Sequence, residues 1–172
     1  KNRLYDRITE EVTKQLDQVE QLLKKKDEKE EQKQLAHICV LSAYIKRRCN
    51  LALLAENSAL LQAKELSYCL KESAEMIQLY GTMVSVDSSC QGETKAEYLI
   101  AVYDTFEQLI EQILDQTDAM LLNVHVLNNQ ICMKIQINLE NAWNIPEWNY
   151  WYAVGGSVNI RQLEKTWYLE FT

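Results

Sequence analysis

Residues 98–114 read YLIAVYDTFEQLIEQIL, and this stretch decides the fold class. Its apolar residues recur every three or four positions, at Tyr103, Phe106, Ile110 and Leu114. This spacing predicts an amphipathic helix. Upstream, Thr94 and Glu97 have the spacing of a capping box, so we expect the helix to begin at Lys95. With 4 Gly and 1 Pro, the chain also lacks the turn residues of an all-β protein, and helices should dominate the fold.

Two earlier apolar stripes predict a helical hairpin. The first runs at spacings of three and four through Leu4, Ile8, Val12, Leu16, Val19 and Leu23. The second runs likewise through Leu35, Ile38, Leu41, Ile45, Cys49, Ala52 and Ala55. Between them, KKKDEKEEQK at residues 24–33 contains no apolar residue, which is typical of a solvated connector. We expect a long antiparallel hairpin over residues 1–56, whose apolar faces a second copy of the chain should cover in a four-helix bundle.

Residues 57–172 mix helical and strand patterns. A helical pattern runs from Gln62 to Tyr80 and ends at Gly81, where a left-handed cap is favoured. Strand patterns are found at residues 59–61, 82–86, 120–127, 131–139, 157–161 and 167–171. Asn128-Asn129 suits a hairpin turn between two of these strands. The predicted fold is α+β: a long helical hairpin, followed by a two-layer α/β sandwich whose mixed sheet is covered on one face by helices.

Charge and composition exclude several classes of function. The formal net charge of -7 and the pI near 4.9 argue against nucleic-acid binding, which needs clustered Lys and Arg. The 5 cysteines lack metal-ligand spacing and are interpreted as reduced, buried residues, as is typical of the cytoplasm. No run of about 20 apolar residues could cross a membrane. We expect a cytoplasmic protein, or the cytoplasmic portion of a membrane protein, without nucleic-acid or membrane contacts in this chain.

The element order and several short segments resemble the sensor histidine kinases. Arg3-Leu4-Tyr5-Asp6-Arg7-Ile8-Thr9, followed by Gln15-Leu16, resembles the first helix of their dimerisation and phosphotransfer hairpin, in the subgroup that carries Leu-His-Asp there. Residues 154–171, VGGSVNIRQLEKTWYLEF, resemble the closing Gly-Gly hairpin of their GHKL ATPase domain. The resemblance covers nearly the whole chain. It implies a homodimer through the hairpin, a GHKL-like domain over residues 57–172, and a response regulator as a partner.

The phosphoacceptor position of this resemblance is occupied by Tyr5, followed by Asp6. A phenol with a pKa of about 10 lacks the imidazole nitrogen that histidine kinases phosphorylate. We therefore expect Tyr5 to be structural. His37, in the second predicted helix, is the alternative phosphoacceptor, and the simpler interpretation is a polar residue near the start of a helix.

The nucleotide site that the resemblance implies is degenerate. Its positions correspond to Glu107, Glu111, Gln112, Glu140, Gly155 and Gly156. Where the family has an Asn that binds magnesium, this chain has Glu111 or Gln112. Glu111 could hold Mg²⁺, but its charge would repel phosphate oxygens unless the ion lay between them. The Gly pair is equally explained by a tight turn.

Two further nucleotide-binding segments have been replaced. The adenine-binding Asp-x-Gly corresponds to Glu140-Asn141-Ala142, which contains no Gly. The flexible Gly-rich lid corresponds to WNIPEWNYWY at residues 143–152, which also contains no Gly. A lid that closes over phosphates needs hinges and polar donors, whereas this segment has bulky rings and Pro146. We expect Trp143, Trp148 and Trp151 to pack on the sheet and to cover the place that ATP occupies in the family.

The favoured interpretation is a bacterial two-component signalling protein that has become a pseudokinase and acts through dimerisation and protein contacts, with no cofactor. One alternative is a divergent active kinase that binds ATP and Mg²⁺ with the help of Glu111. Another is a phosphorelay phosphotransferase that uses His37. The compact basic cluster Lys46-Arg47-Arg48 is predicted either to bind an acidic partner, such as a response regulator, or to form a solvated helix face.

Overall fold

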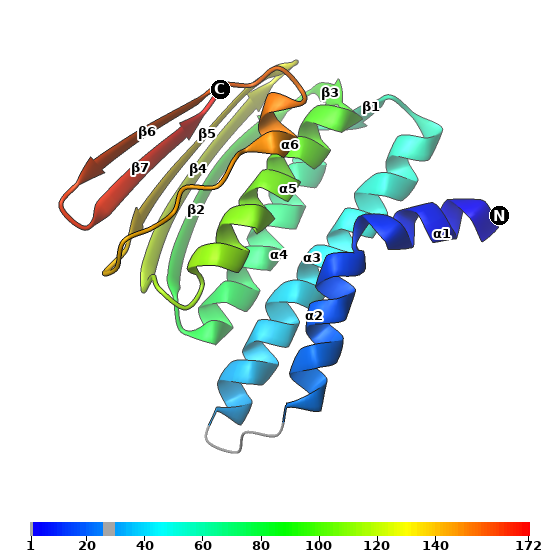
Figure 1. Cartoon of the computed structure of the whole chain (residues 1–172). Coiled ribbons are helices and arrows are strands. Elements are labelled where there is room, and N and C mark those ends of the chain that lie inside the picture. The colour runs from blue at the N-terminus through cyan, green and yellow to red at the C-terminus, as the bar shows by residue number, and fades with distance from the viewer. Residues whose placement is uncertain (1, 26–29) are drawn as a thin grey trace.

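The computed structural model describes residues 2–25 and 30–172, and its N-terminal part is helical (Figure 1). Helices α1 (Asn2–Glu11) and α2 (Thr13–Lys24) come first, and α3 (Glu31–Asn57) runs back along α2 as the second arm of a hairpin. The expected charged connector overlaps residues 26–29, which lie outside the described residues. Its last part already belongs to α3.

The first arm of the hairpin is not the single long helix that its apolar stripe predicted. That prediction is wrong at Val12, where φ is -116° and ψ is 13°, and α1 turns away from the axis of α2 (Figure 1). The hydroxyl of Thr9 donates to the Tyr5 carbonyl at 2.8 Å, and that of Thr13 donates to the Thr9 carbonyl at 3.0 Å. Such bonds bend helices because they compete with the backbone pairing. The bend leaves the Val12 side chain buried.

The remaining elements form the α/β part of the molecule. They are β1 (Leu60–Gln62), α4 (Lys64–Tyr80), β2 (Met83–Gln91), β3 (Glu93–Lys95), α5 (Ala96–Ile113), β4 (Ala119–Leu127), β5 (Gln130–Asn138), α6 (Asn149–Tyr152), β6 (Val158–Leu163) and β7 (Thr166–Phe171). The five-stranded sheet has the order β2-β4-β5-β7-β6. Only its β2–β4 pair is parallel, so the sheet is mixed as predicted. The helices lie on one of its faces (Figure 1).

Two of the predicted local signals are confirmed and one is wrong. Gly81 ends α4 with φ of 114°, and Asn128 adopts φ of 54° in the β4–β5 turn. The capping box is absent, because Thr94 lies in β3 and its hydroxyl donates to the carbonyl of Asn128. The Thr94 side chain therefore ties β3 to this turn, and α5 begins at Ala96 without a side-chain cap.

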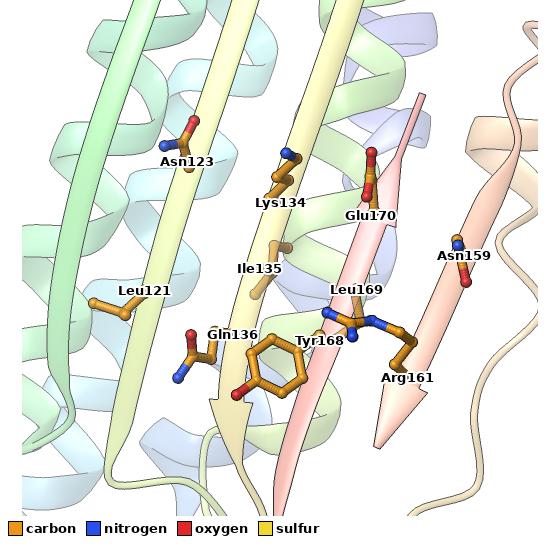
Figure 2. Close-up of a pocket in the computed structure, with 10 residues that line it drawn as sticks. All are labelled: Leu121, Asn123, Lys134, Ile135, Gln136, Asn159, Arg161, Tyr168, Leu169 and Glu170. Atoms are coloured by element: carbon orange, nitrogen blue, oxygen red, sulfur yellow. The ribbon is translucent and has the colours of Figure 1, made fainter. Parts of the chain in front are cut away.

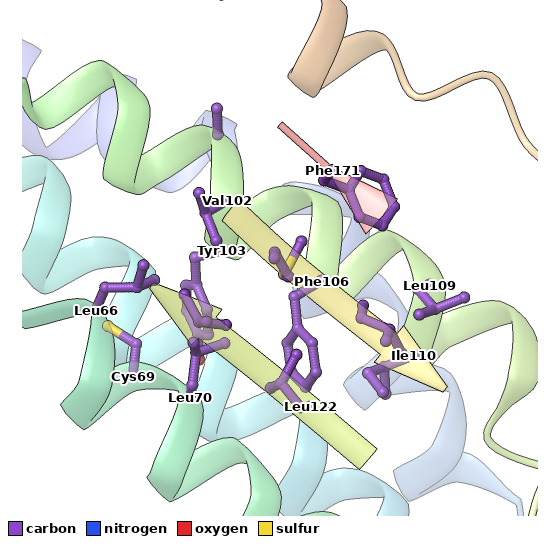
Figure 3. Close-up of a cluster of buried hydrophobic side chains, with 14 of the residues drawn as sticks. Leu66, Cys69, Leu70, Val102, Tyr103, Phe106, Leu109, Ile110, Leu122 and Phe171 are labelled. Atoms are coloured by element: carbon purple, nitrogen blue, oxygen red, sulfur yellow. The ribbon is translucent and has the colours of Figure 1, made fainter. Parts of the chain in front are cut away.

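The core lies between the sheet and the hairpin (Figure 3). Its fully buried side chains come mainly from α4, α5 and the inner face of the sheet, and include Leu66, Leu70, Tyr103, Phe106, Ile110, Leu122 and Phe171. Burial of each such side chain contributes about 1.5–3 kcal/mol. Helix α3 packs on α4 and α5 and adds Val40 and Leu51 to the same core. The predicted boundary at residue 56 falls near the end of α3, and it stays a prediction.

None of the helices in residues 2–25 and 30–172 combines the length and the apolar character that a membrane span requires.

Candidate functional site

The face of α5 that points away from the sheet carries an acidic row. Asp104, Glu107 and Glu111 follow one another at spacings of three and four residues, which places them on one side of the helix. The side chains that contact Asp104 and Glu111 come from α2 and α3. The hairpin therefore covers the part of α5 where the resemblance places the nucleotide-binding residues.

Asp104 is the centre of a buried charged network. The Tyr44 hydroxyl donates to Asp104 Oδ1 at 2.7 Å, and Arg48 Nε donates to the same oxygen at 2.8 Å. The Arg48 guanidinium also lies 2.9 Å from a Glu11 carboxylate oxygen. Burial by itself would lower the pKa of Arg48, but Asp104 raises it above its ordinary value. This is the arrangement of an ionised pair with a structural role.

Glu111 is held by α2. Its two carboxylate oxygens accept hydrogen bonds from Gln15 Nε2 at 3.1 Å and from Gln18 Nε2 at 2.9 Å. Lys14 Nζ lies 3.5 Å from one of them. The residue that we considered as a magnesium ligand is therefore occupied by side chains of the same chain.

Glu107 lies between these two acidic residues and has no such partners. It is 2% exposed, and neither of its carboxyl oxygens has a hydrogen-bond partner among the described residues. It lines a small cavity of about 80 Å³ together with residues that include Gln15, Gln108 and Tyr150. Burial, reinforced by the negative charges of Glu111 and Asp104, raises the pKa of Glu107 well above its ordinary value. The environment favours the uncharged acid.

The segment at residues 143–152 is hydrogen-bonded to Gln108 and Gln112, which follow Glu107 and Glu111 in α5. Trp143 Nε1 donates to Gln112 Oε1 at 3.1 Å, and Gln108 Nε2 donates to the Glu147 carbonyl at 3.0 Å. Trp148 is 2% exposed, and its ring meets that of Phe171 edge to face with centroids 5.0 Å apart. Gln112 therefore holds the lid segment, where the family was expected to hold a metal ion.

The three tryptophans differ in burial. Trp148 and Trp151 are buried, as expected, and Trp143 is half-buried, with its ring 5.3 Å from that of Trp167. The Trp151 ring also explains one glycine. A Cβ at Gly156 would lie 2.2 Å from Trp151 Nε1, so only glycine fits beneath this ring.

Two other positions of the implied nucleotide site have simple structural explanations. Gly155 has φ of 85°, which favours glycine in the turn that precedes β6. Glu140 is exposed just after β5, and its carboxylate accepts a hydrogen bond from Lys165 Nζ at 2.6 Å. Neither residue presents a group with an evident chemical function.

The two candidate phosphoacceptors lie in different surroundings. Tyr5 and Asp6 are exposed on α1. His37 is half-buried on α3, edge to face with Tyr80 at 6.0 Å, and it lines a hollow of about 510 Å³ with Lys33 and Asp115 among its other lining residues. Burial lowers the pKa of His37 below its ordinary value of 6.5, although Asp115 and Glu111 oppose the shift. The imidazole is therefore neutral at pH 7.

The basic cluster does not form one exposed surface. Lys46 and Arg47 both pair with Glu72 of α4, whereas Arg48 is buried in the Asp104 network. Our prediction of a docking surface made of all three residues is wrong for Arg48, because a buried guanidinium cannot meet a partner. For Lys46 and Arg47 it stays a prediction.

The open face of the sheet has a hollow of its own, of about 350 Å³ (Figure 2). Lys134 of β5 and Glu170 of β7 are register partners within it, and the Arg161 guanidinium lies over the Tyr168 ring at 5.2 Å. Amides of Asn123, Gln136 and Asn159 complete a mixed polar lining. The side chains of this hollow can donate and accept hydrogen bonds, and they include both positive and negative charges.

In the part of the chain that the structure describes, no group of three or more His, Cys, Asp or Glu side chains is arranged to hold a metal ion. The five cysteines are present as free thiols. Cys69 is the one that is buried, and burial raises its pKa to about 12, so it is no nucleophile at neutral pH.

Comparisons with known proteins identify the fold. No protein-family model matches the sequence, and no curated protein matches it either. Among solved structures, the histidine kinase domain of the blue-light activated histidine kinase from Erythrobacter litoralis EL346 matches with a TM-score of 0.58 and 10% identity, over 96% of this chain and 93% of that chain. The longer structure of that kinase matches with a TM-score of 0.57 and 11% identity, over 99% of this chain and 62% of that chain. A bacterial phosphotransferase matches with a TM-score of 0.51 and 9% identity, over 98% and 93% of the two chains.

The fold is therefore that of histidine kinase domains, as the sequence resemblance implied, with the helical hairpin and the α/β part in the same order.

Sequence reasoning missed the residues that close the site. Tyr44, Asp104, Gln15, Gln18 and Gln108 were not singled out. One signal was available: the 98–114 stretch, predicted as an amphipathic helix, carries Asp104, Glu107 and Glu111 on one face. Acidic residues on a helix face that becomes buried need partners from another element.

Proposed function

We propose that the chain is a signalling protein of the histidine-kinase type that has lost nucleotide binding and acts through protein contacts. The observation that carries this proposal is the small cavity at α5. Its volume is about 80 Å³, whereas pockets for ligands of drug size are typically about 300–1,000 Å³. Side chains of the chain itself take the place that a nucleotide would need.

The chemistry of this face agrees with the loss of nucleotide binding. Phosphates are held by positive charge and by backbone N–H groups at glycine-rich turns. The α5 face presents the carboxylate of Glu111 instead, and α2 occupies both of its oxygens. The lid segment has two buried tryptophans and is bonded to Gln108 and Gln112. A lid held in this way leaves no flexible cover for a triphosphate.

Thermal melting with MgATP tests the proposal. A site with a Kd of about 10 µM would stabilise the protein by about 2.7 kcal/mol at 1 mM ligand. In a chain of this size, that raises the Tm by roughly 5–10 °C. We expect no such rise, and a clear rise would favour an active ATP-binding kinase instead.

The partner we propose first is a second copy of the chain. Leu16, Leu23 and Leu35 are exposed on α2 and α3, so the hairpin keeps an apolar strip that the α/β part does not cover. Light scattering should give twice the chain mass at micromolar concentration. Leu23→Glu should weaken the dimer, because Leu23 is 65% exposed on this strip. Leu163→Glu, at a residue 67% exposed on β6, is the matched control and should leave the mass unchanged. A monomeric wild type would contradict this assignment.

A response-regulator partner, a bacterial two-component setting and a cytoplasmic location belong to the same proposal. Support for them comes from the histidine-kinase fold. Pull-down of a purified response regulator by the wild type, and its loss in Lys46→Glu, would support the proposed role of the exposed part of the basic cluster.

Phosphotransfer through His37 is a second candidate function. The observation in its favour is a neutral imidazole at a hollow of about 510 Å³, where Lys33 could attract a phosphoryl group and Asp115 lies nearby. Incubation with acetyl phosphate, followed by mass spectrometry, tests it. Phosphorylation that is lost in His37→Gln but retained in His125→Gln, the matched variant at an exposed position of β4, would establish this function. No phosphorylation of the wild type would exclude it.

A further inference from the structure

The proposed loss of nucleotide binding does not explain why the buried carboxyl of Glu107 lacks a partner. It is 2% exposed, both of its oxygens lack a hydrogen-bond partner among the described residues, and it faces a cavity of about 80 Å³. Buried polar groups in native proteins almost always have partners, so an orphan of this kind requires an explanation.

Charged and titratable groups surround this carboxyl on several elements. Those that line its cavity or belong to the adjoining network are Asp104 and Glu111 on α5, Lys14 on α2, Tyr44 and Arg48 on α3, Tyr150 on α6 and Glu11 at the end of α1. Each of the two neighbouring acidic groups already has donors, Asp104 from α3 and Glu111 from α2. No hydrogen-bond donor of the described residues contacts Glu107, so an ionised carboxylate there would be both desolvated and repelled by two like charges.

Helix α2 forms one wall of this cavity. Lys14 and Gln15 line it, and α2 is attached to α5 through polar side chains on Glu111. Helix α3 is fixed more firmly, since Arg48 and Tyr44 bind Asp104 and Leu51 belongs to the core. A movement of α2 away from α5 would therefore open Glu107 to bulk water.

We propose that protonation of Glu107 controls the seating of α2 on α5. The uncharged acid is compatible with the closed helix. When Glu107 loses its proton to water, the carboxylate is left on α5 beside Asp104 and Glu111, and this charge is better stabilised once α2 has lifted and the site is open to bulk water. Rising pH therefore releases α2 from α5.

Glu107 and the α2 residues that cover it lie next to the point where the lid segment is attached to α5. Glu107 and Glu111, which face α2, are adjacent in sequence to Gln108 and Gln112, which bind the segment at Glu147 and Trp143. Lifting α2 would expose the acidic row of α5 beside this segment. The device couples the N-terminal hairpin to the α/β part through one helix.

Hydrogen exchange of the full chain tests the latch. Protection factors, already corrected for the intrinsic exchange rate, would be measured for residues 13–24 of α2 between pH 5 and pH 9. Burial raises the pKa of Glu107 above the value of 4.5 that applies once the group is exposed. Between these two values the closed form binds the additional proton, so the opening equilibrium should rise about tenfold per pH unit.

Two variants and one internal reference make the outcome decisive. Glu107→Gln keeps the shape without a titrating proton and should abolish the pH dependence in α2. Glu97→Gln, at an exposed position on α5, should behave as the wild type. Exchange in α4, residues 64–80, should not follow pH in the same way. A wild-type α2 without pH dependence, an unchanged dependence in Glu107→Gln, or parallel changes in α2 and α4 would each overturn the proposal. The measurement follows α2 and not nucleotide, so its outcome is distinguishable from a failure of the proposed function.

Discussion

Replacing Arg48 by Ala should destabilise the protein far more than replacing its neighbour Lys46. Arg48 is 7% exposed, donates to Asp104 at 2.8 Å and lies 2.9 Å from a Glu11 oxygen. Its loss leaves Asp104 buried with only the Tyr44 hydroxyl as a donor. Removal of one partner of a buried ion pair costs about 3–5 kcal/mol, because the remaining charge is uncompensated. For a chain of this size, the Tm should fall by roughly 6–20 °C.

Urea denaturation, followed by circular dichroism, measures this difference. Lys46→Ala is the matched control, since its side chain is largely exposed and Arg47 also binds Glu72, so the loss should be below about 1 kcal/mol. The double variant Arg48→Met with Asp104→Leu removes both charges and should recover part of the loss. If Arg48→Ala and Lys46→Ala lowered the free energy of unfolding by similar amounts, the buried network would be refuted. The hypothesis that Lys46, Arg47 and Arg48 form one exposed surface would then be favoured again.

Three further predictions concern the lid segment and His37. Trp148→Ala should lower the free energy of unfolding, measured by urea denaturation, by about 3–5 kcal/mol, because it leaves a cavity at a buried site. Tyr150→Ala, at an exposed ring, should lower it much less. Equal losses would mean that the segment is not packed on the sheet. Gly156→Ala should lower the free energy of unfolding by about 1–3 kcal/mol and increase the acrylamide quenching of tryptophan fluorescence, because the added methyl displaces the Trp151 ring. Unchanged quenching would contradict the close approach of Gly156 to Trp151. The NMR titration of His37 should give a pKa below 6.5, so stability should be lost as pH falls through the interval between 6.5 and the folded value; a pKa above 6.5 would contradict the burial of the imidazole.

The order of the elements was accessible from the sequence because it depends on local periodicity. The helix over residues 98–114, the cap at Gly81 and the Asn128-Asn129 turn are set by residues close together in the chain, and all three are present. The break at Val12 was missed, since the apolar stripe continues through it, and the Thr9 and Thr13 hydroxyls that bond backbone carbonyls on either side of it are a weak sequence signal.

The candidate site was less accessible, because its contacts join residues that are distant in sequence. The Arg48–Asp104 pair spans 56 positions, and the Gln15–Glu111 bond spans 96. Neither separation leaves a local pattern. The basic cluster was therefore interpreted as one surface, although the helical turn directs Lys46 and Arg48 to different neighbours. The loss of glycine from the lid was visible in the sequence, whereas the attachment of the lid to Gln108 and Gln112 required the structure.

Titration of the full chain with a fluorescent ATP analogue in the presence of Mg²⁺ tests the closed α5 face most directly. We predict a signal that rises linearly with protein concentration, does not saturate up to about 100 µM, and is unaffected by excess unlabelled ATP. Such a weak interaction corresponds to a binding free energy no more favourable than about -5 kcal/mol. Saturable binding at micromolar concentration that unlabelled ATP displaces would contradict the account, because a nucleotide would then fit where the structure places Gln15, Gln18 and the lid segment.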